Sequence, residues 1–222
     1  MPILFESNFN GEGEGTSPPV KFLNSVASPM DIFEVDDAHY HSSPHGAKMV
    51  GTNKYCHSTY SFTATTERFS TWLYFDTTNN SRALYTQRTP GDFDPTKWLI
   101  YINFDASANI QYYSGGWHDT GTNYSTGWHH IEIVHDFGSD VYDMWYDDSK
   151  IISGGGFYAA GVADSFKSFG HNVGTGNLWM DDVQIGEASG WDGNYNGFEN
   201  PNQLNDYSRI NTREVNGYES VS

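Results

Sequence analysis

The chain has 222 residues, 37% of them hydrophobic, with 14 Phe, 15 Tyr and 7 Trp. Such rings bury enough area to build a core, and 23 Gly favour strands joined by tight turns, which argues against disorder and an all-helical fold. The formal charge of −17 repels phosphate backbones and so argues against nucleic acid as a partner. The same charge suits divalent cations, a saline environment or solubility alone.

The single cysteine, Cys56, cannot form an internal disulfide, so packing or a metal must hold the fold. No run of about 18 apolar residues marks a membrane-inserted segment. The start of the chain lacks the basic and long apolar regions of a secretory signal, so no signal peptide is visible. We expect either synthesis without export, as for viral particle proteins, or removal of a leader.

Strand-like segments recur along the chain about every ten residues. The first is 3–9, followed by a Gly-, Ser- and Pro-rich loop, and the second is 31–40, which ends in a histidine-bearing turn. Further strands are predicted at 48–65, 67–77, 82–88, 98–106, 109–117, 127–137, 141–148, 150–155 and 177–186. This spacing is typical of an antiparallel sandwich or jelly roll.

Alternation along these segments predicts which face of each strand is buried. Ile131 and Ile133 share one face of their strand, while Glu132 and Val134 share the other. In the last strand, one face is expected to carry Leu178, Met180, Asp182 and Gln184, and the other Trp179, Asp181, Val183 and Ile185. The two adjacent aspartates then point apart, unless the strand ends or bulges there.

From about residue 187 the chain is rich in Asn, Gly and Ser and has no sustained periodicity. We therefore predict one domain over residues 1–187 and a polar extension, linker or interaction arm over 188–222. No internal repeat indicates a solenoid or propeller.

Four segments resemble the concanavalin A-like and laminin-G-like jelly-roll superfamily. Gly127, Trp128 and His129 resemble the Gly-Trp-His start of one of its strands, and 145–148 resembles the turn that follows, with Asp148 where Gly is usual. The segments 4–11 and 178–186 resemble its opening and last core strands, which lie side by side. The resemblance covers roughly residues 3–187 and implies an all-β, two-sheet antiparallel jelly-roll sandwich (concanavalin A-like) with an irregular C-terminal extension. It implies little about function, because this fold hosts lectins, hydrolases, lyases and structural modules.

The resemblance also implies a metal site. Some jelly-roll modules bind a structural Ca²⁺ through an Asp on the last strand and a carboxylate near the first, and Asp182 and Glu6 are the matching positions here. The alternative is that one aspartate is solvated and the other accepts hydrogen bonds from turn amides. A second candidate is His39, His41 and His45, which a turn could bend around a transition metal or leave in solvent.

The catalytic patterns of this fold are incomplete in the chain. Retaining glycosidases need two carboxyl groups about 5 to 5.5 Å apart, and no Glu-x-Asp-x-Glu run provides them. Lyases of this fold use Arg against a uronate and Tyr or His to move protons, but none of their familiar sequence strings occurs. We therefore assign no catalytic residue.

One aromatic, Gly-rich stretch fits sugar binding, which needs exposed ring faces beside Asn, Asp or Gly that hydrogen-bond hydroxyls. The predicted glycan ligands are Tyr112, Tyr113, Trp117, His118, Asp119, Asn123 and Tyr124. A second group consists of Trp191, Asp192 and Tyr195. The alternative is that these rings cap the sandwich or pack on a neighbouring subunit.

The sequence thus predicts a non-catalytic surface recognition or assembly module that contacts glycans or neighbouring protein subunits, and that forms a homo-oligomer in the second case. We expect an extracellular location or a virion surface, where a decoration or tail protein needs no secretory signal. Two alternatives remain: a carbohydrate-active enzyme, lyase or hydrolase, on the same fold, and a purely structural particle protein.

Overall fold

The computed structural model describes residues 3–7, 9, 13–16, 22–24, 29–42, 44–58, 66–88, 95–158, 168–174 and 176–187. The predicted extension, with Trp191, Asp192 and Tyr195, lies outside the described residues. The described elements are strands, apart from one short 3₁₀ helix, η1 (Pro95–Lys97). Among these residues, no helix is long and apolar enough to cross a lipid bilayer.

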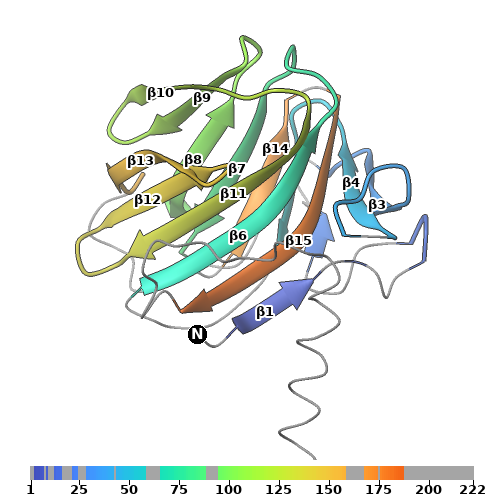
Figure 1. The fold of residues 1–222 in the computed structure, drawn as a ribbon, viewed down its shortest axis with the longest axis horizontal. Coiled ribbons are helices and arrows are strands. Elements are labelled where there is room, and N and C mark those ends of the chain that lie inside the picture. The colour runs from blue at the N-terminus through green and yellow to red at the C-terminus, as the bar shows by residue number, and fades with distance from the viewer. Residues whose placement is uncertain are drawn as a thin grey trace, which may run out of the picture. The chain divides into compact units, whose positions relative to one another are not determined.

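Two antiparallel sheets, of eight and seven strands, form a sandwich (Figure 1). The first sheet contains, in spatial order, β13 (Ser149–Gly156), β12 (Val141–Tyr146), β11 (Gly127–Asp136), β6 (Thr66–Phe75), β15 (Asn177–Glu187), β4 (Gly46–Val50) and β3 (Ile32–Asp36), with β1 (Ile3–Ser7) also beside β15. The second contains β10 (Trp117–Asn123), β9 (Asn109–Tyr113), β8 (Trp98–Phe104), β7 (Arg82–Gln87), β14 (Ser168–Val173), β5 (Lys54–Ser58) and β2 (Phe22–Asn24). The predicted all-β, two-sheet antiparallel sandwich is confirmed.

The first strand pairs with the last, as predicted. β1 lies along the second half of β15, with Phe5 opposite Ile185 (Figure 1). β4 pairs with the first half of the same edge, with Met49 opposite Leu178. Since β6 follows the other edge, β15 is held on both sides.

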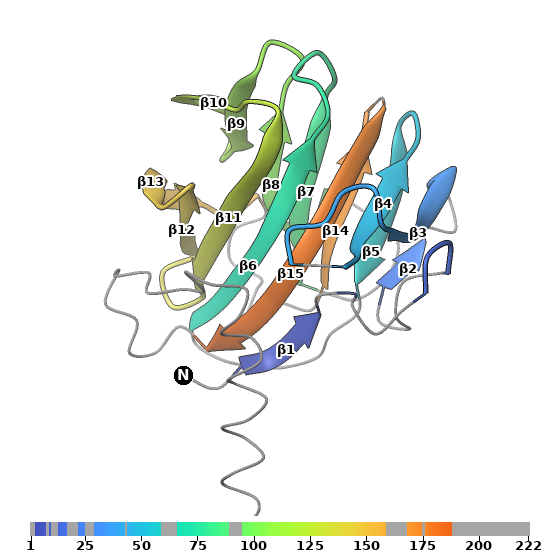
Figure 2. The same cartoon turned by 45° about the vertical axis from the view of Figure 1, so that its right-hand side comes forward.

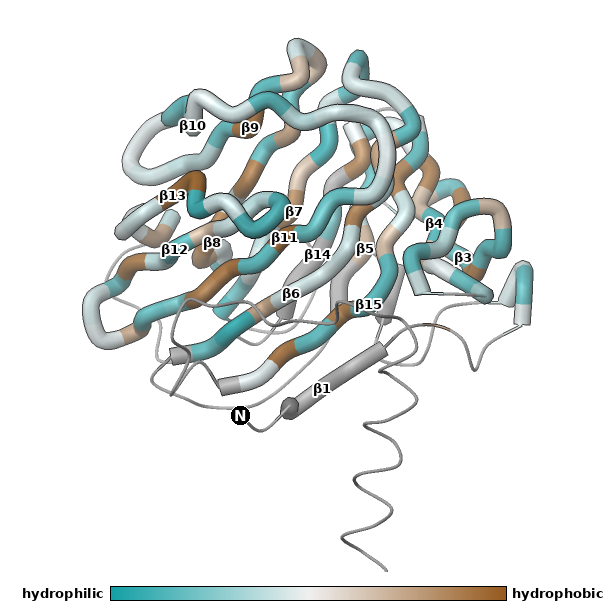
Figure 3. Tube along the Cα trace, in the orientation of Figure 1, coloured by the Kyte–Doolittle hydropathy of each residue, from teal (hydrophilic) through white to brown (hydrophobic). Residues whose placement is uncertain are grey.

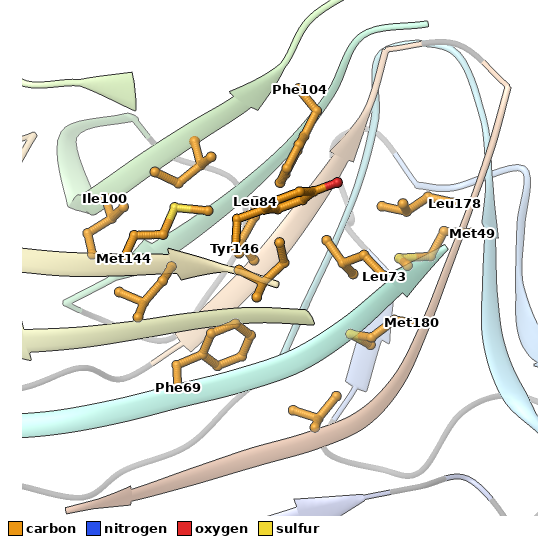
Figure 4. Close-up of a cluster of buried hydrophobic side chains, with 14 of the residues drawn as sticks. Met49, Phe69, Leu73, Leu84, Ile100, Phe104, Met144, Tyr146, Leu178 and Met180 are labelled. Atoms are coloured by element: carbon orange, nitrogen blue, oxygen red, sulfur yellow. The ribbon is translucent and has the colours of Figure 1, made fainter. Parts of the chain in front are cut away.

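The core lies between the two sheets. Ile131 and Ile133 are both fully buried in it, which confirms the alternation predicted for β11. Figure 4 shows part of this core, with side chains from both sheets: Met49, Phe69, Leu73, Leu84, Ile100, Phe104, Met144, Tyr146, Leu178 and Met180. Along β11 and β15, hydrophobic and hydrophilic residues alternate, as expected for strands with one buried face (Figure 3). Each large buried side chain contributes about 1.5–3 kcal/mol.

Three strands, β2, β10 and β14, were not predicted from the sequence. β14 pairs with both β7 and β5, and its Gly170 stands between Tyr85 and His57 in register. The Tyr85 hydroxyl donates to the carbonyl of Cys56 on β5, at 3.0 Å. Because Gly170 has no Cβ, the Tyr85 ring can cross β14 at that point, and this glycine weakens the strand signal.

Candidate functional site

β15 contains a bulge at the two adjacent aspartates. Its register with β6 shifts between Asp181 and Gln184, and Asp182 has a φ of 48°. The extra residue reverses the alternation, so the buried core includes Leu178, Met180, Val183 and Ile185. The alternation predicted for this strand is therefore correct up to Asp181 and wrong after it.

Both aspartates bind the loop 37–45, which joins β3 to β4 and passes in front of β15 in Figure 2. Oδ2 of Asp181 accepts the backbone N–H groups of His41 and Ser42, each at 2.9 Å. Oδ1 of Asp182 accepts the Ser42 hydroxyl at 2.5 Å, and its Oδ2 lies 2.8 Å from Nδ1 of His41. The bulge thus fixes both the backbone and the ring of His41.

Asp181 is a buried anchor for this loop. Burial and the charge of Asp182 raise the pKa of Asp181 to about 8, and backbone N–H groups of Ser42, Asp182 and His41 oppose that rise. The hydroxyl of Thr71 donates to the backbone carbonyl of Asp181 at 3.1 Å, which connects the bulge to β6.

The predicted calcium ligands, Glu6 and Asp182, lie on paired strands. Glu6 is opposite Gln184 in the β1–β15 ladder, and its side chain lies outside the described part of the structure. Both carboxylate oxygens of Asp182 are already used by Ser42 and His41. Calcium takes about six to eight oxygen ligands. Among the described residues, no group of three or more His, Cys, Asp or Glu could hold a metal. The calcium site at Glu6 and Asp182 therefore stays a prediction.

Five partly exposed rings gather on the outer side of the eight-stranded sheet, and we call them the histidine–aromatic face: His39, His41, Trp72, Tyr74 and Trp128. His41 stacks on Trp72, with ring centroids 3.7 Å apart, and His39 stacks on Tyr74 at 4.1 Å. Trp128 presents an edge contact to Tyr74 at 5.5 Å. The face therefore joins the loop 37–45 to β6 and β11.

Polar side chains beside this face are paired. Arg68 forms a two-pronged ion pair with Glu132, at 2.9 and 3.0 Å. Nε2 of His130 lies 2.9 Å from the Ser70 hydroxyl. Burial and the charge of Arg68 lower the pKa of His130 to about 4, so this ring is neutral at pH 7. Because Glu132 already binds its guanidinium, Arg68 is not the free cation that a uronate lyase requires.

A second group of rings lies on the outer side of the seven-stranded sheet, and we call it the hairpin platform: Trp98, Tyr101, Tyr113, Trp117 and Tyr158. Trp117 stands opposite Tyr113 in the β9–β10 hairpin, with ring centroids 5.6 Å apart. Tyr158 approaches Tyr113 to 4.4 Å. Trp117 is 54% exposed, the most of any large hydrophobic side chain among the described residues.

The other predicted glycan ligands are not part of this platform. Tyr112 and His118 stack on each other at 5.1 Å, and Tyr112 packs against the core. Asp119 caps the backbone N–H of Gly121, and Asn123 pairs with Asn109. Tyr124 is only 2% exposed, and its hydroxyl donates to the carbonyl of Asp105 at 2.7 Å. Tyr124 is therefore a core residue, and of the predicted set Tyr113 and Trp117 belong to the platform, with Asp119 in the next row of the same hairpin.

The histidine–aromatic face was not predicted from the sequence. A signal was present in β6, where Trp72 and Tyr74 alternate with the apolar Leu73 and Phe75. Such a strand places rings with polar atoms on one face and purely apolar side chains on the other.

No family model matches the chain, and no curated protein matches it. Its structure is similar to that of a sialidase, with a TM-score of 0.63 and 10% identity, over 98% of this chain and 21% of that one. It is also similar to the globular domain of T. cruzi calreticulin, with a TM-score of 0.56 and 9% identity, over 97% of each chain. The chain thus spans about a fifth of the length of the sialidase. At these identities the likenesses show the fold alone, that of a β-sandwich.

Proposed function

We propose that the chain is a non-catalytic carbohydrate-binding module of the concanavalin A-like type. The observation that carries this proposal is the hairpin platform, where Trp117 is 54% exposed beside Tyr113 and Tyr101, at 5.6 and 5.7 Å. The exposed indole of Trp117, which meets the two partly exposed tyrosine rings edge to face, offers an apolar ring on which the C–H groups of a sugar can stack.

Hydrogen-bonding groups border the platform. Within the described part of the chain, Nε1 of Trp117 and the hydroxyls of Tyr113 and Tyr158 bond to no protein group. Polar side chains follow in the neighbouring row, where Gln111 stands opposite both Asn103 and Asp119. These groups can donate to or accept from sugar hydroxyls.

The enzymatic alternative has less support. Arg68 is bound by Glu132, and the adjacent carboxylates Asp181 and Asp182 hold the loop 37–45.

Glycan binding at an exposed platform fits an extracellular or particle-surface setting, and the extension 188–222 would then be an arm that contacts neighbouring subunits. The sandwich shared with the sialidase and calreticulin structures supports the fold part of the proposal.

A glycan array probed with the wild type, Trp117→Ala and His118→Ala tests the proposal. His118 is the matched control, because it is an exposed neighbour whose ring stacks on Tyr112, away from the platform. The wild type and His118→Ala should bind the same glycans, and Trp117→Ala should lose them. Equal binding by Trp117→Ala would refute the proposal, and release of unsaturated products from uronate polysaccharides would favour a lyase.

A further inference from the structure

We infer that the histidine–aromatic face is a second carbohydrate-binding site, so that one chain bridges two neutral glycans. This inference rests on the proposed carbohydrate-binding function. The hairpin platform lies on the outer side of the seven-stranded sheet and the histidine–aromatic face on that of the eight-stranded sheet. The core separates the two surfaces, because packed sheets lie about 10 Å apart.

His41 is held in one orientation with a single ring nitrogen left over. Asp181 binds its backbone N–H, Asp182 binds Nδ1 at 2.8 Å, and the ring stacks on Trp72. The side chain is 25% exposed, and within the described structure its Nε2 has no hydrogen-bond partner. With Nδ1 paired to a carboxylate, Nε2 is the one polar atom of the ring that is left for a ligand. A ligand hydroxyl is a suitable partner, because it can both donate and accept a hydrogen bond.

The rings around His41 also carry unused polar atoms. Nε1 of Trp72, Nε1 of Trp128 and the hydroxyl of Tyr74 form no hydrogen bond to the protein within the described structure. A packed ring of this sheet behaves differently: Trp179 is 4% exposed, and its Nε1 donates to Asp36 at 2.6 Å. Partly exposed rings that combine an apolar face with a free donor or acceptor are suited to a polyhydroxylated ring.

The charges around the face select a neutral ligand. Arg68 is paired with Glu132, and Nζ of Lys48 lies 3.7 Å from Asp36. The carboxylate of Asp182 lies 2.8 Å from Nδ1 of His41, and the whole chain carries a formal charge of −17. An anionic sugar would meet repulsion without a free cation to offset it among the described side chains beside this face.

Isothermal titration with cellohexaose, xylohexaose, laminarihexaose and mannohexaose tests the inference, with tetragalacturonate as the anionic comparison. The wild type should bind two molecules of a neutral hexasaccharide per chain. Trp117→Ala and Trp128→Ala should each retain one site, and the double variant none. Tyr40→Ala is the matched control for the second site, because Tyr40 is a 42% exposed ring on the same loop, outside the ring contacts of the face.

His41→Phe provides an independent variant, because it keeps an aromatic ring over Trp72 and removes the hydrogen-bonding atom Nε2. It should weaken binding at the second site about tenfold, as expected for one lost hydrogen bond. Beads coated with the bound glycan should aggregate with the wild type but not with either single tryptophan variant.

Each other result identifies what fails. One site that Trp117→Ala abolishes and Trp128→Ala leaves intact would overturn the second site and keep the proposed function. One site that Trp128→Ala abolishes and Trp117→Ala leaves intact would overturn the hairpin platform as a binding site. The histidine–aromatic face would then be the site, and one chain would not bridge two glycans. Binding of tetragalacturonate alone would overturn the choice of a neutral ligand, and no binding of any probe would overturn both proposals.

Discussion

Replacing Arg82 with alanine should destabilise the sandwich strongly, because this buried cation joins the loop 76–81 to the start of β15. Its side chain is 0% exposed and pairs with Asp76. It donates to the backbone carbonyls of Asn177 at 2.7 Å and Thr77 at 2.9 Å. Burial lowers the pKa of Arg82, and the negative charge of Asp76 raises it. Arg82 stays charged, because arginine is not deprotonated in proteins.

The size of the effect follows from the groups left behind. Removing one partner of a buried ion pair costs about 3–5 kcal/mol, because the other charge is left uncompensated. The Asp76 side chain is 27% exposed, so water and the amide of Asn177 recover part of the loss. We expect a free energy of unfolding lower by about 3 kcal/mol, a large share of the roughly 5–15 kcal/mol typical of domains.

Urea unfolding followed by tryptophan fluorescence measures this change. With a slope of about 2 kcal/mol/M, the midpoint should fall by about 1.5 M. Arg88→Ala is the control, because Arg88 is partly exposed and Nη2 donates to a single carbonyl, that of Thr96, at 3.1 Å. Arg82→Lys should lose most of the same stability, because lysine keeps the charge without the fork of donors. A loss for Arg82→Ala no larger than that for Arg88→Ala would refute the reasoning.

Three further predictions concern a turn, buried histidines and calcium. Asp148→Gly should raise the free energy of unfolding by about 0.5–1 kcal/mol in urea titrations, because Asp148 has a φ of 64° and its side chain is 69% exposed. Acid should destabilise the fold, because burial lowers the pKa of His135 to about 4 and of His171 to about 3. Their neutral forms stabilise the fold fully above about pH 6.5, and this contribution is lost towards pH 4, at up to about 1.4 kcal/mol per pH unit for each histidine. If Glu6 and Asp182 bind calcium, adding it should raise the unfolding temperature, and Asp182→Asn should reduce that rise.

The matched comparisons keep these effects separate. Asp147 should be left in place, because its carboxylate binds Nδ1 of His129 at 2.6 Å and the backbone N–H of His130 at 2.9 Å. The pH effect is measured as the difference between wild type and His135→Gln at pH 7 and pH 5. This difference cancels Asp181, whose raised pKa acts in the opposite sense and lowers stability as the pH rises from about 4 to about 8. Equal pH slopes for the two proteins would contradict the role of His135, and an unchanged unfolding temperature with calcium would contradict the metal site.

Patterns within single strands were readable from the sequence. Period-two alternation in β11 placed Ile131 and Ile133 in the core, and the resemblance of the end strands placed β1 beside β15. The phase of β15 beyond Asp181 was not readable, because the bulge depends on the loop 37–45, about 140 residues away in sequence. The rings of the histidine–aromatic face and of the hairpin platform likewise come from different strands. Which of these strands lie side by side is decided only when the sheets form.

The antiparallel pairing of β1 with β15 also decides how the domain responds to force. Ile3 stands opposite Gly186, so the chain enters and leaves the sandwich at neighbouring points. Tension between those points acts along the ladder hydrogen bonds and loads them one after another, because antiparallel bonds run across the strands. β1 should therefore separate from β15 at low force, one hydrogen bond after another, while the β6–β15 ladder stays intact.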